Sequence, residues 1–335
     1  MKHIQEPPFS IQIELTEGCN LACWFCGIAG IRNNGINGVD RISGKNSKPY
    51  KFMKAYDART IAKKIKESEW TSRIEFAMHG EPTLNPWIIE IVTLFRNFLP
   101  KNSLMMSSNG GGLLKDTTHK INLLFESGLN TLLLEDYKHA NIVDKIKKKY
   151  EGPYEFSYYP ENKAANPHKR RRPSEKLIVI VEDISEATSG THSTLNNHTG
   201  CAFPLDYENE FARCALPFRE MAIRWNGKVA LCCNDFRGVY KCGSVLKSDL
   251  NKIWQNKYFR AARKSLYNNY RDFKPCFGCN TRSMRVGLLP DKLGKQTLKE
   301  PSTKDLAAIK KAISGKPYSK IVKRPWEEKW YQQLG

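Results

Sequence analysis

Six short strand-like segments alternate with helix-like segments over residues 11–181 of this 335-residue chain. The strand-like segments are apolar and β-branched runs, and the helix-like segments repeat apolar residues with a helical period. Strands that alternate with helices in this way pair in parallel through right-handed crossovers. The sequence therefore predicts an α/β fold, and six units suggest a partial (βα)6 TIM-like barrel. We expect strands at 11–15, 73–78, 103–107, 130–134, 154–158 and 176–181, and helices at 56–69, 86–98, 117–127 and 140–149.

A loop with three cysteines directly follows the first expected strand. Cys19, Cys23 and Cys26 have the spacing C-x3-C-x2-C. Three thiolates on one loop can bind three irons of a [4Fe–4S] cluster and leave the fourth iron open to a small molecule. Structural zinc sites use four protein ligands and prefer C-x2-C pairs, so zinc fits this triplet less well. An open iron indicates chemistry rather than a purely structural site.

Polar residues follow three more of the expected strands. Loops after the C-terminal ends of barrel strands converge on one face of the barrel, where active sites form. The cysteine loop and these polar residues are therefore expected at the same mouth. The three strand ends are Met78-His79-Gly80-Glu81-Pro82, Ser107-Ser108-Asn109-Gly110 and Glu135-Asp136.

These motifs together resemble the radical S-adenosylmethionine (radical SAM) superfamily. The resemblance rests on the cysteine loop with Phe25 before its last cysteine, followed by a Gly-Glu-Pro strand end and a Ser-Asn-Gly strand end. It implies a barrel of the radical SAM type, in which the three cysteines hold a [4Fe–4S] cluster and SAM binds the open iron through its amine and carboxylate. Reduction of the cluster then yields methionine and a 5′-deoxyadenosyl radical, which abstracts hydrogen from a substrate. An external electron donor of the flavodoxin or ferredoxin type is also implied.

The resemblance also suggests contacts to SAM. Gly80 and Glu81 would meet the SAM amine, because glycine allows close backbone approach and a carboxylate accepts hydrogen bonds from an ammonium group. Ser108 and Asn109 would hydrogen-bond the ribose or the carboxylate. His79 stands where the family often has a second glycine. The cofactor-binding candidates are Phe25, Gly80, Glu81, Ser108, Asn109 and, for the ribose, Glu135.

Four later cysteines form a second candidate site. They are separated into two groups along the chain, and a β-hairpin is expected around Trp225-Asn226-Gly227-Lys228 in the first group. Four thiolates can complete a closed metal site, which could not bind SAM. A four-cysteine zinc ribbon is the alternative. The four residues are Cys214, Cys232, Cys276 and Cys279.

The sequence around these cysteines resembles the shortened auxiliary-cluster module called twitch, a reduced form of the SPASM domain. After the C-x2-C pair the chain continues as NTRSMRVGLLPDK, without the further cysteines of a full SPASM domain. The resemblance implies one auxiliary [4Fe–4S] cluster bound by the four cysteines. We therefore divide the chain into a radical SAM partial barrel at 1–200, a small α+β twitch/SPASM-like domain at 201–290 and a basic tail at 291–335, with a weak helical pattern at 302–314.

Three cysteines remain unassigned. Adjacent residues on a strand point to opposite faces, so Cys233 is not expected to bind the same cluster as Cys232. Cys201 and Cys242 are expected to be small buried residues, and a ligand or hydrogen-donor role near the substrate is the alternative.

Two irregular segments are candidates for substrate contacts. Residues 30–49 are rich in glycine, asparagine and charge, and a loop of this length is either functional or disordered. Polar side chains after the sixth strand could bind substrate or act as a base, and a solvated linker is the alternative. No catalytic base is assigned. The polar side chains are Glu182, Asp183, His192, Asn196, Asn197 and His198.

The formal net charge is +20, and part of it lies in the C-terminal tail and in the run Lys169-Arg170-Arg171-Arg172. Such a charge attracts polyanions, including nucleic acid, and a solubility-tuned surface is the alternative. The N-terminus lacks an apolar signal core, and no stretch of 18 apolar residues occurs. We expect a cytoplasmic protein that does not enter a membrane. In that reducing environment its ten cysteines favour metal binding over disulfides.

Several reactions are consistent with these features. A single auxiliary cluster resembles that of inosamine-oxidising dehydrogenases in this superfamily, which suggests oxidation or rearrangement of an alcohol, amino or sugar carbon. The charge suggests modification of a nucleic-acid base instead. A SPASM maturase of ribosomal peptides is an alternative, but only about ten residues precede the first strand, so we expect no N-terminal leader-binding domain. A non-catalytic zinc-binding nucleic-acid adaptor is the alternative from another class.

Overall fold

The computed structural model describes residues 6–21, 23, 25–28, 50–137, 140–181, 196–202, 214–268, 270–281 and 301–313. The candidate substrate segment at 30–49 lies outside these residues. So do Glu182, Asp183 and His192 of the second polar segment.

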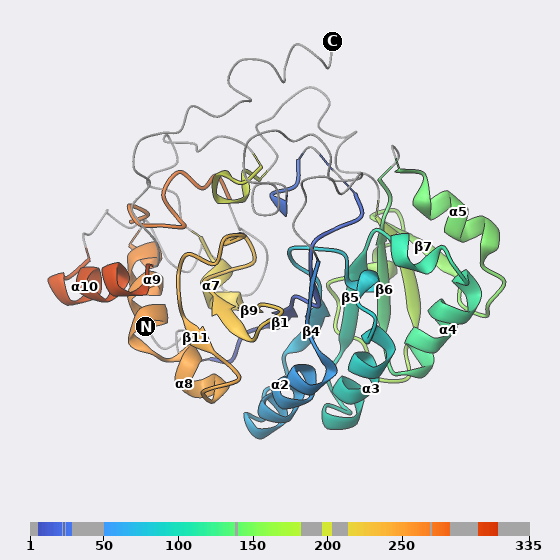
Figure 1. Ribbon diagram of the computed structural model, residues 1–335, viewed down its shortest axis with the longest axis horizontal. Coiled ribbons are helices and arrows are strands. Elements are labelled where there is room, and N and C mark those ends of the chain that lie inside the picture. Colours follow the sequence, from blue (N-terminus) through green and yellow to red (C-terminus); the bar gives the residue numbers. More distant parts are fainter. Residues whose placement is uncertain are drawn as a thin grey trace, which may run out of the picture.

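Nine of the described strands form one sheet, in the order β11-β10-β9-β1-β4-β5-β6-β8-β7 (Figure 1). Every neighbouring pair from β9 to β7 is parallel, and the pairs that involve β10 are antiparallel. The predicted α/β fold with a partial parallel barrel is confirmed. The strands are β1 (Ser10–Ile13), β4 (Arg73–Phe76), β5 (Leu104–Ser108), β6 (Thr131–Glu135), β7 (Phe156–Tyr159), β8 (Leu177–Val181), β9 (Glu220–Ile223), β10 (Lys228–Ala230) and β11 (Gly243–Ser244), and β2 (Thr16–Glu17) pairs separately with β3 (Lys51–Phe52).

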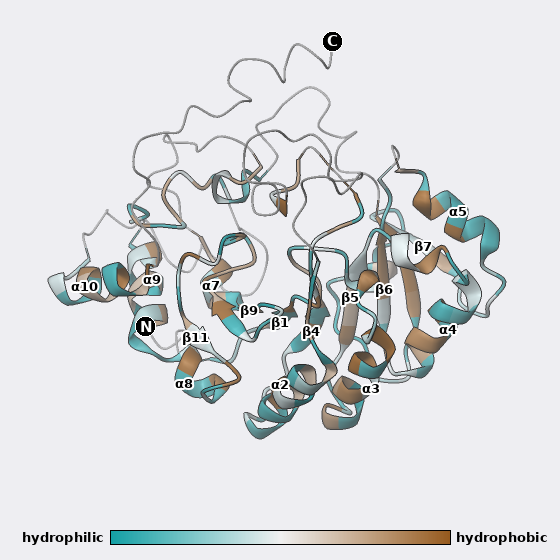
Figure 2. Ribbon diagram, viewed as in Figure 1, coloured by the Kyte–Doolittle hydropathy of each residue, from teal (hydrophilic) through white to brown (hydrophobic). Residues whose placement is uncertain are grey.

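The main core lies between the sheet and its covering helices. Alternate strand residues such as Ile11 and Phe76 are fully buried, and the Phe76 ring meets Phe95 of α3 edge-on with 5.2 Å between centroids. Figure 2 shows hydrophobic residues concentrated along β5 and β6, whereas α2 has a mixed surface. The helices of this half are α2 (Ala55–Glu67), α3 (Ile88–Phe98), α4 (Thr117–Glu126) and α5 (Ile142–Lys149), with short 3-10 turns η2 (Pro82–Leu84), η3 (Gly111–Leu113) and η5 (Lys163–Ala165).

The order of the last two barrel strands is not sequential. A simple succession of units would put β7 beside β6, but β8 pairs with β6 and β7 lies at the edge of the sheet. Strand β8 has the sequence LIVIV with three buried residues, whereas all four residues of β7, FSYY, are half-buried. The more apolar strand thus takes the position with neighbours on both sides, where parallel strands are most buried.

The C-terminal half continues the same sheet. Strand β9 pairs in parallel with β1, and β10 folds back on β9 through the predicted hairpin, in which Gly227 has a φ of +72°. The proposed domain limit near residue 200 therefore separates two segments that share one sheet. The other elements are η7 (His198–Gly200), α7 (Leu216–Arg219), α8 (Leu250–Trp254), α9 (Lys257–Tyr267) and α10 (Thr303–Ala312).

The expected helix in the tail is present as α10, which packs against α9. Its first turn is capped by the Ser302 hydroxyl, which accepts a hydrogen bond from the Asp305 N–H at 3.2 Å. No helix in the described part of the chain is long and apolar enough to cross a membrane.

The basic run at 169–172 partly folds inward at the start of the strands. Arg171 is 9% exposed and donates to the Thr131 hydroxyl at 3.2 Å and to backbone carbonyls. Arg170 lies over the Phe9 ring, with its guanidinium carbon 4.7 Å from the ring centroid. Part of this charge is therefore used within the fold and is not displayed as a continuous exposed patch.

Candidate functional site

The three-cysteine loop begins directly after β2. Cys23 is 7% exposed, and the Cys26 N–H donates to the Cys23 carbonyl at 3.1 Å, which bends the loop between these two thiols. Cys19 Sγ accepts hydrogen bonds from the Leu21 N–H at 3.4 Å and from Asn109 Nδ2 at 3.2 Å. Burial, followed by the charge of Glu81, raises the pKa of Cys19 well above its usual value. Hydrogen-bond donors directed at a buried sulfur are compatible with a thiolate bound to a metal cluster, because bound iron would stabilise the ionised form of the thiol.

Glu81 is the centre of the neighbouring polar cluster. Its Oε1 accepts from the Ser108 hydroxyl at 2.6 Å and from the Thr83 N–H at 2.9 Å, and its Oε2 accepts from the Asn109 N–H at 2.7 Å. Burial raises the pKa of Glu81, and these donors act against the shift. The fold thus brings together three predicted SAM contacts from the ends of β4 and β5. Hydrogen bonds from Thr83, Ser108 and Asn109 fix the position of the Glu81 carboxyl group.

Gly80 is required by a close approach of two backbones. It forms a parallel bridge with Gly18, and the Glu81 N–H donates to the Gly18 carbonyl at 2.9 Å. A Cβ at Gly80 would lie 2.1 Å from the Thr16 carbonyl oxygen, so no other residue fits this backbone. The glycine therefore joins the Gly-Glu-Pro strand end to the start of the cysteine loop, a role in addition to the predicted contact with the SAM amine.

Tyr137 contacts two more of the predicted SAM-binding residues, Glu135 and Phe25. Glu135 Oε1 accepts from the Ser107 hydroxyl at 2.6 Å, and its Oε2 accepts from the Tyr137 hydroxyl. The Tyr137 ring lies 5.7 Å from the Phe25 ring. Burial, and then Glu135, raises the pKa of Tyr137, so this phenol keeps its proton. Sequence reasoning missed Tyr137, although it lies two residues beyond a strand end that was already singled out.

The four later cysteines line one cavity, as predicted. Its wall also includes Asn234, Arg271 and Thr281. A single zinc ion would need four sulfurs about 2.3 Å from one point. Among the described residues, no group of three or more His, Cys, Asp or Glu is arranged to hold a single metal ion. Four thiols around a shared cavity are arranged as a bound iron–sulfur cluster would require.

Burial of these thiols disfavours their ionised form. Burial raises the pKa of Cys214 to about 11 and those of Cys232 and Cys276 well above their usual values. Arg271, 2% exposed, acts in the opposite direction on Cys214 and Cys276 and donates to the Cys279 carbonyl at 2.7 Å. Cluster binding would therefore release protons, and Arg271 places a buried positive charge beside the ligands.

The unassigned cysteines do not line this cavity in the described part of the chain. Cys233 is directed toward Glu220, whose Oε1 accepts from the Cys233 N–H at 2.9 Å. Cys242 is fully buried in the main core, and Cys201 packs with Ile28 beside the first cysteine loop. Cys242 therefore occupies the position of a small buried apolar residue.

Two residues of the second polar segment bind the cluster loops. His198 Nδ1 accepts from the Gly27 N–H at 2.8 Å, next to Cys26, and burial lowers the pKa of His198 to about 3, which leaves this nitrogen a neutral acceptor. Asn197 Nδ2 donates to the Gly278 carbonyl at 2.7 Å, between the last two cysteines of the second site. These neighbouring side chains, considered above as substrate contacts or bases, hold one loop of each metal site.

A polar wall lines one side of the barrel interior. Gln12, Glu75 and Glu220 lie on adjacent strands β1, β4 and β9, and Gln12 Nε2 donates to Glu220 Oε2 at 3.0 Å. Strand register places them on the face opposite the main core. Burial raises the pKa of Glu220 to about 7. The facing wall is apolar, with Met105, Leu133 and Val179.

Comparisons with known proteins agree with this arrangement. The family model described as the radical SAM superfamily matches residues 13–135, and the SPASM model, an iron–sulfur cluster-binding domain, matches residues 214–280. Among curated proteins, the S-adenosyl-L-methionine-dependent 2-deoxy-scyllo-inosamine dehydrogenase of Niallia circulans is 21% identical over 278 residues, which cover 82% of this chain and 94% of the relative.

Solved structures show the same fold. The crystal structure of BtrN in complex with AdoMet and 2-DOIA has a TM-score of 0.60 at 18% identity, over 86% of this chain and 98% of that chain. BtrN in an open conformation has a TM-score of 0.54 at 17% identity, over 82% and 94% of the two chains. The chain thus belongs to the radical SAM superfamily with a C-terminal SPASM domain, and its cofactors are SAM, a SAM-binding [4Fe–4S] cluster and an auxiliary iron–sulfur cluster.

Proposed function

We propose that this protein is a radical SAM dehydrogenase that oxidises a hydroxyl-bearing carbon of a small polar substrate, with an aminocyclitol as the first candidate. The likeness to the inosamine dehydrogenase carries this proposal, because it extends over 82% of this chain and 94% of that relative. The zinc-binding adaptor no longer fits a member of this superfamily.

The site suits the electron balance of such a reaction. Conversion of an alcohol into a ketone removes a hydrogen atom from carbon, a proton from oxygen and one further electron. When bound, the two clusters and SAM would supply the radical that takes the hydrogen atom and a second centre that accepts the electron. The four cysteines around the second cavity support this assignment, because four protein ligands would leave no iron of that cluster open to substrate.

The interior of the barrel supports a polar substrate with hydroxyl and amino groups. Its polar wall contains two carboxyl groups and one amide, from Glu75, Glu220 and Gln12. Glu75 Oε1 is paired with buried Arg73, and Glu220 Oε1 accepts from the Cys233 N–H, so substrate would use the remaining hydrogen-bonding capacity of these groups. These groups can bind hydroxyl and ammonium hydrogens. The apolar wall around Met105 and Val179 can pack against the hydrocarbon face of a ring.

The test is turnover of the reconstituted full chain without oxygen. With SAM, dithionite and 2-deoxy-scyllo-inosamine, we expect a ketone and 5′-deoxyadenosine in about equal amounts. Substrate carrying deuterium at the reacting carbon should transfer it to 5′-deoxyadenosine. If a panel of aminocyclitols and sugars gives 5′-deoxyadenosine without any deuterium transfer or ketone, the dehydrogenase proposal is wrong while SAM cleavage still holds.

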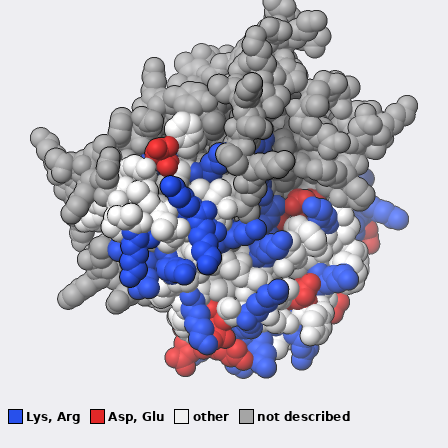
Figure 3. All heavy atoms as spheres, turned by 60° about the vertical axis from the view of Figure 1, so that its left-hand side comes forward, with Lys and Arg blue, Asp and Glu red and all other residues white. Residues whose placement is uncertain are grey.

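A second candidate, modification of a base within a nucleic acid, draws on the surface charge. Exposed Lys257 and Arg260 of α9 lie near exposed Lys310 and Lys311 of α10. Figure 3, which brings this side of the molecule forward, shows many Lys and Arg side chains and few Asp or Glu. An acidic flavodoxin-type or ferredoxin-type donor could dock on the same face.

Salt separates these uses of the surface. Binding of RNA or DNA should weaken by about one log unit per log unit of salt for each phosphate contact. If only turnover driven by flavodoxin falls with salt, and turnover driven by dithionite does not, the surface serves the electron donor. The second candidate would be favoured by two results together: nucleic-acid binding that weakens steeply with salt, and no transfer of deuterium from aminocyclitols to 5′-deoxyadenosine.

A further inference from the structure

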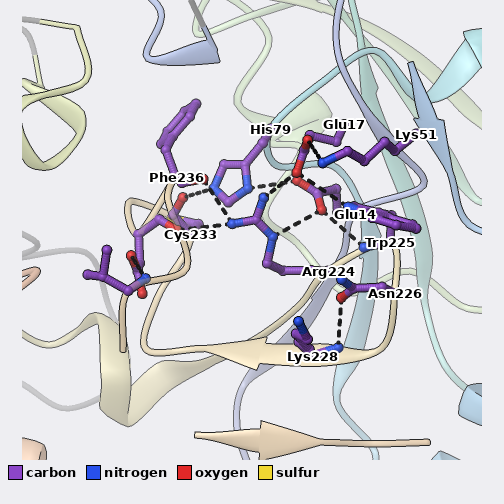
Figure 4. Close-up of polar contacts among 12 residues, drawn as sticks. Glu14, Glu17, Lys51, His79, Arg224, Trp225, Asn226, Lys228, Cys233 and Phe236 are labelled. Atoms are coloured by element: carbon purple, nitrogen blue, oxygen red, sulfur yellow. Dashed lines mark hydrogen bonds and ion pairs between the residues drawn. The ribbon is translucent and has the colours of Figure 1, made fainter. Parts of the chain in front are cut away.

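A buried charge network connects the SPASM hairpin to the SAM site (Figure 4). Arg224 follows β9 and reaches two carboxylates of the barrel. Its Nη2 lies 2.7 Å from Glu17 Oε2, and its Nε lies 3.4 Å from Glu14 Oε2. Its Nη1 donates to the Phe236 carbonyl at 2.8 Å, which fixes the guanidinium on the side of the SPASM domain. The Arg224 side chain is 9% exposed, so these contacts lie largely out of water.

Glu14 links this arginine to the strand end that carries Gly80 and Glu81. The other Glu14 oxygen, Oε1, lies 2.8 Å from His79 Nδ1, and the Trp225 N–H donates to Oε2 at 3.0 Å. Burial acts to raise the pKa of Glu14, but His79 and Arg224 outweigh it and the pKa is lowered. Glu14 is fully buried and therefore depends on these partners for its charge.

Glu17 and His79 adjoin residues that are expected to bind the cluster or SAM. Glu17 precedes Cys19 by two residues, and His79 directly precedes Gly80. The two loops are tied to each other, since the Gly18 N–H donates to the His79 carbonyl at 3.2 Å. A shift of either carboxylate would therefore move the cysteine loop and the Glu81 loop together.

We propose that Arg224 is a positioning residue for SAM: from the SPASM domain it holds Glu14 and Glu17 and thereby sets the geometry of the two loops that bind the cluster and the SAM amine. The inference needs only SAM binding, so it stands apart from the choice of substrate. His79 then has a function where the family often has glycine, because its side chain completes the link.

The same network reaches the auxiliary site. His79 Nε2 lies 2.6 Å from the Cys233 carbonyl, and Cys233 directly follows the ligand Cys232. The His79 ring also contacts Phe236, at 4.2 Å between centroids, and Phe236 stacks on His198, at 4.6 Å. Since coupling between two binding events is reciprocal, formation of the auxiliary cluster and binding of SAM should favour each other.

The test measures SAM affinity on anaerobically reconstituted full-length protein by equilibrium dialysis with radiolabelled SAM, with the low-temperature EPR change on SAM addition as a second readout. Arg224→Gln should weaken SAM binding about 10-fold or more, and Arg224→Lys, which keeps the charge but not the forked geometry, about 3-fold. Trp225→Phe removes the indole donor, whose Nε1 lies 3.3 Å from Glu17 Oε2, and shrinks the ring that Lys51 overlies; it should weaken binding about 2-fold to 4-fold.

Arg263→Lys is the matched control. Arg263 is another buried arginine of the C-terminal half, but it donates to the Pro217 and Trp254 carbonyls, away from the SAM loops. This variant should lose stability and still bind SAM as the parent does. The proposal is overturned if Arg263→Lys weakens binding as much as Arg224→Lys. It is also overturned if Arg224→Gln retains the parent's affinity or, should that variant fail to fold, if Trp225→Phe does.

Discussion

Asn109 Nδ2 lies 3.2 Å from Cys19 Sγ, so an amide that follows β5 donates to the sulfur of the first cysteine in the loop after β2. The Asn109 backbone N–H meanwhile donates to Glu81 Oε2 at 2.7 Å. One residue therefore contacts both a cysteine expected to bind the cluster and the carboxylate expected to meet SAM. Its position connects the electronic properties of the cluster with the binding of the cofactor.

Asn109→Ala should lower the reduction potential of the SAM-binding cluster. A hydrogen bond to a ligand sulfur stabilises the more negative reduced cluster. A bond worth about 1 kcal/mol corresponds to a shift of about 40 mV for one electron. Redox titration followed by EPR, without SAM, measures it. Asn109→Asp, which loses the donor but keeps the size, should shift the potential in the same direction, and no shift in either variant would contradict the role.

Cys23→Ala should abolish SAM cleavage, because the cluster would lose one of three protein ligands. Iron content should fall by about four atoms per chain, and 5′-deoxyadenosine should not form above background. Cys242→Ala is the control, since Cys242 is fully buried in the core and lines neither metal site among the described residues. It should lower stability and retain both iron and SAM cleavage.

Cys276→Ala should separate SAM cleavage from product formation. Loss of one of four ligands removes the auxiliary cluster, so iron should fall from about eight to about four atoms per chain. We expect 5′-deoxyadenosine still to form, at a lower rate because of weaker SAM binding, while ketone formation from the aminocyclitol falls at least about 100-fold. Full ketone formation by a four-iron variant would show that the electron leaves by another route.

Glu81→Gln should weaken SAM binding by about 10-fold or more. The change removes the charge that attracts the ammonium group, and it also places an amide donor among the Thr83, Ser108 and Asn109 donors. Glu126→Gln, at an exposed position in α4, is the control and should leave the dissociation constant unchanged. Equal affinities of parent and Glu81→Gln would exclude a contact with the SAM amine.

Glu220→Gln should change how stability depends on pH. Burial raises the pKa of Glu220 from 4.5 to about 7, so between these values the folded state binds more protons than the unfolded state. The stability of the parent therefore falls as the pH rises through this window, by up to about 3 kcal/mol from this group. The glutamine cannot ionise, so the stability of the variant relative to the parent should increase by that amount between pH 4.5 and 7.5. Chemical denaturation of both proteins across this range tests it, and a constant difference would contradict the shift.

The sequence was sufficient for the six predicted barrel strands and for dividing seven of the cysteines into two groups. Strand periodicity is local, and cluster ligands follow fixed short spacings, as in the loop from Cys19 to Cys26. The polar strand ends at Glu81 and Ser108 were also found in this way, because parallel strands bring their C-terminal ends to one edge of a sheet. The order of β7 and β8 was not found from the sequence, because it depends on which of the two strands is stabilised more by burial between neighbouring strands.

Only the tertiary structure showed which residues contact these motifs and hold them in place. Glu14, Glu17 and Arg224 carry no motif, and Arg224 is more than 200 positions from both carboxylates, so nothing local marks their contact. The pairing of β9 with β1 brings them together, and burial then makes each charge depend on the others. Sequence alone indicated which residues are candidates to bind iron and SAM, because ligand chemistry is a property of residue type and spacing. Tertiary structure decided what holds those residues in place, because long-range packing and the loss of water determine which charges meet.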